Sequence, residues 1–95
     1  MSIDFRLLVL DPDSAVVVCD RWLGGRHTLE AAQEILARPA HSASLGLECW
    51  SGVAPDDVRR IADASYVGGG TPKEVTVLSE RFPTPRYVWM LVSGY

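Results

Sequence analysis

The last nine residues of the chain, 87–95, are apolar at both of their alternating sets of positions. A strand built from them has two apolar faces, with Val88, Met90 and Val92 on one and Trp89 and Leu91 on the other. A strand at a wetted sheet surface carries polar residues on one face. We therefore expect this segment to form a central strand, or one whose second face meets another molecule.

Length and composition indicate a single domain spanning 1–95. The chain has 95 residues, 47% of them hydrophobic and 22% charged, and a chain of this size buries roughly 60–65% of its unfolded surface. No apolar run approaches the roughly 20 residues that span a bilayer, and the first residues lack signal-peptide character. We expect a cytoplasmic protein with no membrane segment.

Alternating hydrophobicity and turn signals predict five strands, over 3–10, 15–22, 43–50, 74–82 and 87–95. The turn Asp11-Pro12-Asp13-Ser14 joins the first two into a hairpin. Two helices are expected, one beginning at the N-cap Thr28 and ending before Pro39, the other beginning at Pro55 and ending at Gly68-Gly69-Gly70. The segment 83–85 would be a hairpin loop between the last two strands.

This order, β-β-α-β-α-β-β, predicts an α+β two-layer sandwich. Both helices would pack on one face of a mixed sheet of about five strands. The strand 43–50 divides its residues most clearly between two faces: Leu45, Leu47 and Cys49 on one, Ser44, Gly46 and Glu48 on the other. The uncovered face of the sheet should then be mostly wet, and an apolar patch added there by 87–95 would indicate an interface.

Reactive residue types do not form a catalytic or metal-binding pattern. Cys19, His27, His41 and Cys49 could supply a zinc site, but no pair has the short separation of a metal knuckle. No nucleophile motif with a base and an orienting group is present. We therefore expect two reduced, buried thiols, no metal, no cofactor and no enzymatic activity.

The turn Gly24-Gly25-Arg26-His27-Thr28 is the one candidate anion site. It leads into a helix N-terminus, where free amides and the helix dipole attract anions, and Arg26 and His27 would add donors. The alternative is that these residues serve only the local structure, because a tight strand-to-helix turn also requires two glycines and a cap residue.

Arginines beside aromatic residues are the strongest indication of a binding surface, because Trp, Tyr and Arg are enriched at interface hot spots. Arginine stems covering core aromatics would give the same pattern. The net charge of −3 and the absence of a basic run disfavour nucleic acid. The expected partner-binding residues are Arg21, Trp22, Arg26, Arg86, Tyr87 and Trp89.

These observations predict a small non-enzymatic module that binds a protein partner stoichiometrically, or that forms a homodimer through 87–95. Phage-encoded inhibitors of host defence complexes are one class of protein that acts in this way. The competing prediction is a phosphate-, nucleotide- or other small-ligand-binding protein, or a small enzyme, that uses the turn Gly24–Thr28.

Overall fold

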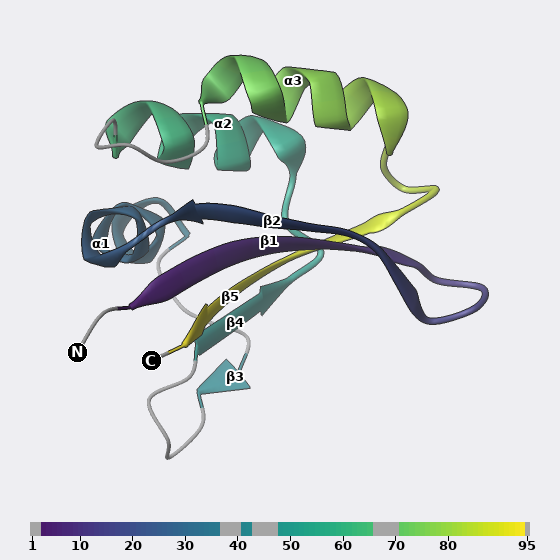
Figure 1. Cartoon of the computed structure of the whole chain (residues 1–95), viewed down its shortest axis with the longest axis horizontal. Helices are drawn as coiled ribbons and strands as arrows, with labels where there is room; N and C mark the ends of the chain where they lie inside the picture. Colours follow the sequence, from purple (N-terminus) through teal and green to yellow (C-terminus); the bar gives the residue numbers. More distant parts are fainter. Residues whose placement is uncertain (1–2, 37–40, 43–47, 66–70, 95) are drawn as a thin grey trace.

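Three helices lie on one side of an antiparallel sheet (Figure 1) in the computed structural model, which describes residues 3–36, 41–42, 48–65 and 71–94. Four strands carry the sheet: β1 (Asp4–Asp11), β2 (Val16–Gly24), β4 (Glu48–Ser51) and β5 (Val88–Gly94). The two-residue strand β3 (His41–Ser42) pairs with β4. The helices are α1 (Arg26–Ile35), α2 (Pro55–Ala64) and α3 (Pro72–Arg81).

The strand order is β2-β1-β5-β4-β3, so the C-terminal strand is central, as expected. The predicted mixed sheet is wrong, because every strand pair within the described residues is antiparallel. The reason is the connection between β4 and β5. In the predicted order one helix led from the strand 43–50 to a strand over 74–82, and such a strand–helix–strand unit makes its two strands parallel when they share a sheet. Instead α2 leads away and α3 leads back, so β5 starts beside the end of β4 (Figure 1).

Residues 74–82, predicted to be a strand, form most of α3 and the residue that caps it. The hydroxyl of Thr71 accepts a hydrogen bond from the Glu74 N–H at 3.2 Å, which caps the first turn. Pro72 follows at the first helical position, where its missing N–H costs nothing. These start signals outweigh the alternating valines that favoured a strand.

The burial of α3 follows a helical spacing. Val75 and Leu78, three residues apart, are buried, whereas Val77 is 56% exposed. An alternating strand would have placed Val75 and Val77 on the same face. The segment 83–85 consequently connects a helix to a strand and is not a hairpin loop; it contains a cis Thr84–Pro85 peptide bond.

The other helix boundaries agree with the sequence in part. Helix α2 begins at Pro55 as expected, with two aspartates in its first turn, and it ends at Ala64. Helix α1 begins at Arg26 with Gly25 as its N-cap, so the prediction of Thr28 as the cap is wrong. The expected Gly68–Gly70 cap lies outside the described residues.

One hydrophobic core fills the space between the sheet and the helices. Phe5, Leu7, Val9, Trp89 and Leu91 on the two central strands are fully buried. They pack in one cluster with helical residues that are also buried, among them Leu29, Ala32, Val58, Ile61, Val75 and Leu78. Trp89 is thus a core residue, and its indole N–H donates a hydrogen bond to the Phe82 carbonyl at 3.0 Å.

Strand β4 turns its tryptophan, not its cysteine, toward the core. Trp50 is 4% exposed and lies opposite Leu91. Cys49 lies opposite Val92 on the other face, contrary to its expected place on the covered side. A buried indole removes far more apolar area from water than a thiol does, so Trp50 decides the register. The predicted division of residues 44–47 between the two faces of the strand concerns residues outside the described part of the chain.

Candidate functional site

The face of the sheet opposite the helices is unusually apolar, and its centre is β5. Along β5 burial alternates, so that Trp89 and Leu91 are fully buried and the residues between them are only partly covered. Directly opposite residues on antiparallel strands share a face. Leu8 lies opposite Met90 and Leu10 lies opposite Val88, so β1 extends the apolar surface.

The neighbouring strands widen this surface. Val17 of β2 pairs with Leu10 and is 47% exposed, while Trp22 pairs with Arg6 and is 44% exposed. No helix covers it within the part of the chain that the structure describes (Figure 1). We call this surface the open face; its apolar members are Leu8, Leu10, Val17, Trp22, Cys49, Val88, Met90 and Val92.

One ion pair crosses the open face. Arg6 Nε donates to Asp20 Oδ1 at 3.1 Å, and both side chains are about half exposed. Because each charge is matched by the other, the pair interrupts the apolar surface without giving it a net charge. An exposed pair of this kind contributes at most about 1 kcal/mol to stability.

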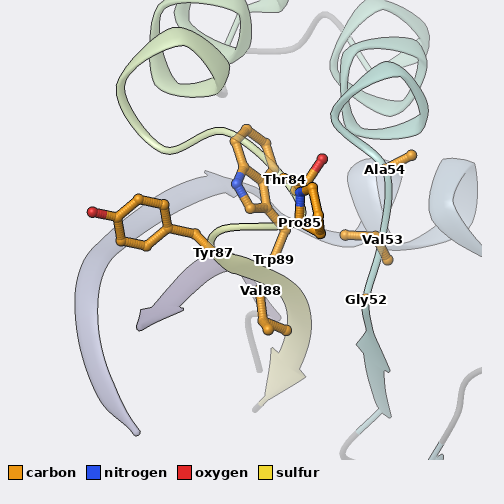
Figure 2. A pocket seen from close by; sticks show the side chains of 8 residues that line it. All are labelled: Gly52, Val53, Ala54, Thr84, Pro85, Tyr87, Val88 and Trp89. Atoms are coloured by element: carbon orange, nitrogen blue, oxygen red, sulfur yellow. The ribbon is translucent and has the colours of Figure 1, made fainter. Parts of the chain in front are cut away.

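A cavity of about 280 Å³ lies at one end of β5, beside the open face. Figure 2 shows Val88 and Trp89 pointing to opposite sides of the strand, with Pro85 and Val53 facing one another nearby. The lining of this cavity contains no acidic, basic or thiol group. It consists of Gly52, Val53, Ala54, Thr84, Pro85, Tyr87, Val88 and Trp89. The cavity suits an apolar side chain better than a reacting substrate.

The predicted partner-binding residues do not form one patch. Arg21 lies opposite Leu7 on the helix side of β2, whereas Trp22 lies on the open face. Arg26 is exposed at the start of α1. Trp89 is fully buried and cannot touch a partner while the protein is folded.

Arg86 and Tyr87 are held by local contacts. The Arg86 guanidinium lies 3.7 Å from Asp11 and 3.6 Å from Asp13, in the β1–β2 turn. It also lies 5.1 Å from the centre of the Tyr87 ring. Tyr87 in turn meets Phe82 edge to face at 5.3 Å. Through these contacts Arg86 and Tyr87 connect the β1–β2 turn to the start of β5, which accounts for this Arg/aromatic pair without a binding partner.

The turn Gly24–Thr28 is shaped by packing. Thr28 is 3% exposed, and a Cβ atom added to Gly24 would overlap its hydroxyl oxygen. The Thr28 side chain is therefore not presented to a ligand. Arg26 and His27 are exposed at the helix start, and nothing else among the described residues there points to an anion.

The two cysteines are free and half-buried. Burial raises the pKa of the Cys19 thiol, against a smaller lowering by Arg21, and burial alone raises the pKa of the Cys49 thiol. Strands β1 and β5 separate β2 from β4. Three strand spacings come to about 14 Å, twice the reach of a disulfide.

We expect both thiols to react with iodoacetamide severalfold more slowly than glutathione at neutral pH, because a raised pKa leaves less thiolate. The rate should climb as the pH rises through the pKa of each thiol. Mass spectrometry of single-cysteine variants, Cys19→Ser and Cys49→Ser, would resolve the two sites. A thiol that reacts faster than glutathione in the folded protein would contradict this and would favour an enzyme.

Neither a cluster of metal ligands nor a membrane-spanning helix is found among the described residues. Within residues 3–36, 41–42, 48–65 and 71–94, no three histidine, cysteine or acidic residues are grouped to hold a metal ion. In the same residues, no helix has the length and apolar character needed to cross a membrane. Comparison of the chain with protein-family models, with curated proteins and with solved structures found no match in any of the three.

Proposed function

We propose that this protein is a non-enzymatic module that binds a protein partner through the open face. One observation carries the proposal: the open face presents apolar side chains from β1, β2, β4 and β5, while the helices of the described residues lie on the opposite side. A sheet in a two-layer monomer normally turns polar residues to water on its uncovered side. Extended apolar patches on soluble proteins mark binding surfaces.

The chemistry of the open face selects an apolar partner surface. Trp22 is the largest exposed side chain on it and the natural hot spot. The cavity beside Val88 offers room for one apolar side chain of the partner. A stoichiometric inhibitor needs such a surface and no catalytic group, and phage-encoded blockers of host defence complexes are one class that would fit this proposal.

Two neighbouring valines provide a matched test of the open face. Val17 and Val16 are exposed to 47% and 54%, but Val16 lies opposite Asp11, on the other side of the strand. In pull-downs with the purified partner, Trp22→Ser should weaken binding at least tenfold, which corresponds to roughly 1.4 kcal/mol. Val17→Ser should weaken it severalfold, and Val16→Ser should bind like the wild type.

The same variants separate a different protein from a second copy of this chain. Light scattering should show a monomer for both the wild type and Trp22→Ser, with the partner held one to one. A wild-type dimer that Trp22→Ser dissociates would replace the proposed partner by a homodimer through β5. Unchanged partner affinity in folded Trp22→Ser would remove the open face from the proposal.

A further inference from the structure

A second surface of different chemistry lies between β2 and α3. It is a hollow of about 280 Å³ lined by Arg21, Lys73, Glu74, Val77, Leu78 and Arg81. We call it the basic groove. Three cations face one carboxylate there, although the whole chain has a net charge of −3. A local excess of positive charge on an acidic protein favours an anionic partner at this place.

Helix α3 presents the groove as a single stripe. Lys73, Val77 and Arg81 recur every four residues, which places them one above another on the same helix face. Val77 is the most exposed large apolar residue of the described chain at 56%, and the next residue, Leu78, which also lines the groove, is buried. The groove therefore combines cations at both ends of the stripe with an apolar centre.

Two of the cations have no ion-pair partner among the described residues. Arg21 lies 3.7 Å from Glu74, so this pair cancels. Arg81 lies over the Phe82 ring at 5.6 Å, a contact that leaves its charge uncompensated. Lys73 and Arg81 take part in no ion pair within the part of the chain that the structure describes.

Strand β2 adds a backbone feature to the same place. It is nine residues long and stands first in the sheet order, and within the described residues only β1 pairs with it. Every second residue of such an edge strand directs its N–H and C=O groups outward, where an added strand can pair with them. An extended peptide is the occupant that satisfies both the free backbone and the cations.

We propose that the basic groove binds an extended acidic segment of a protein partner, which adds a strand to the free edge of β2 and turns its carboxylates toward Lys73 and Arg81. This rests on the proposed function only in that the segment belongs to a protein partner. Alternate residues of the added strand would point to the other side, toward Val17 and Trp22 on the open face. The segment therefore alternates acidic and apolar residues.

The groove fits nucleic acid less well than peptide. Val77 and Leu78 form an apolar centre in the groove that a peptide side chain can contact and that a sugar–phosphate backbone cannot use. The lining contains no aromatic side chain on which a base could stack.

The test titrates fluorescein-labelled peptides, of roughly the length of β2, into the intact protein and maps the amides that shift by NMR. The probes are a Glu/Val alternating peptide, its Lys/Val counterpart, and a single-stranded oligonucleotide. The Glu/Val peptide should bind, shift amides of β2 and α3, and weaken steadily with added salt. The double variant Lys73→Glu/Arg81→Glu should bind it at least tenfold more weakly and should gain affinity for the Lys/Val peptide.

Arg26→Glu is the matched control, because it reverses one exposed charge at the start of α1, where an acidic residue suits the helix dipole. It should leave the affinity for the Glu/Val peptide within twofold. The proposal is overturned by no binding of that peptide, by equal affinity in Lys73→Glu/Arg81→Glu, or by tighter binding of the oligonucleotide. Partner capture that depends on Trp22 but not on Lys73 and Arg81 would remove this proposal and keep the proposed function. Binding of the Glu/Val peptide, together with partner capture that does not depend on Trp22, would keep this proposal and remove the proposed function.

Discussion

Replacing Trp89 with Ser is expected to unfold the protein. Trp89 is fully buried at the centre of the core, and its indole N–H bonds to the Phe82 carbonyl at 3.0 Å. Truncating a buried tryptophan costs about 3–5 kcal/mol, before the added cost of leaving the carbonyl without its donor. Small domains have only about 5–15 kcal/mol of stability in total. Circular dichroism during urea titration should show little or no cooperative transition.

Trp22→Ser is the matched control, because the same chemical change is made at a side chain that is 44% exposed. It should keep a cooperative transition with a loss of no more than about 1 kcal/mol. Trp89→Phe should fall between the two, since it keeps most of the apolar volume and loses the hydrogen bond. If Trp89→Ser unfolds at the same urea concentration as the wild type, Trp89 is not a core residue and the fold described above is wrong.

Gly24→Ala is expected to destabilise the protein by about 1–3 kcal/mol, the usual cost of forcing extra volume into a packed site. Gly24 pairs with Phe5 at the end of β2, and an added Cβ would overlap the Thr28 hydroxyl oxygen. Thr28 is buried within α1, so another rotamer of its side chain would meet packed neighbours. Either that rotation or a shift of the helix against the strand is needed to make room. Thermal and urea unfolding would both report the loss.

A double variant identifies the cause of that loss. Thr28→Ala removes the oxygen that the new methyl group would meet, so Gly24→Ala should cost less in its presence, with a coupling of about 1 kcal/mol or more. Gly25→Ala is the control, because its Cβ would come no closer than 3.4 Å to the Ile3 carbonyl oxygen. If the losses of stability in Gly24→Ala and Thr28→Ala simply add in the double variant, the overlap is not the cause. The backbone conformation of Gly24 would then explain why a glycine is needed there.

Much of the local structure could be predicted because its causes lie close together in the chain. The hairpin β1–β2 follows from the turn after Asp11, whose carboxylate accepts a hydrogen bond from the Asp13 N–H at 3.0 Å. Pro55 starts α2 because a proline at the first helical position costs no hydrogen bond. In contrast, α3 was missed because its valines alternate, although Thr71 and Glu74 were a readable capping signal.

The candidate surfaces were only partly foreseeable. Trp22 was identified as a binding residue from its type and its neighbours, and the structure places it on the open face. The basic groove was missed because Lys73, Val77 and Arg81 form a stripe only once the segment is helical. Their spacing of four residues was the available signal. That Arg21 joins them depends on where α3 packs, which no local pattern states.

The sequence by itself predicted a strand over 87–95 with two apolar faces, which belongs either in the middle of a sheet or at an interface, and the structure places β5 (Val88–Gly94) inside the sheet. The sequence could not determine which face is inside, because both sets of alternating residues are hydrophobic enough for a core. Only the tertiary structure decided this, by placing the three helices on the same side of the sheet as Trp89 and Leu91, in one core cluster with them. The physical reason is that two short connections return α2 and α3 to the same side, where Trp89 can both bury its ring and bond to Phe82. Val88, Met90 and Val92 were thereby left on the open face.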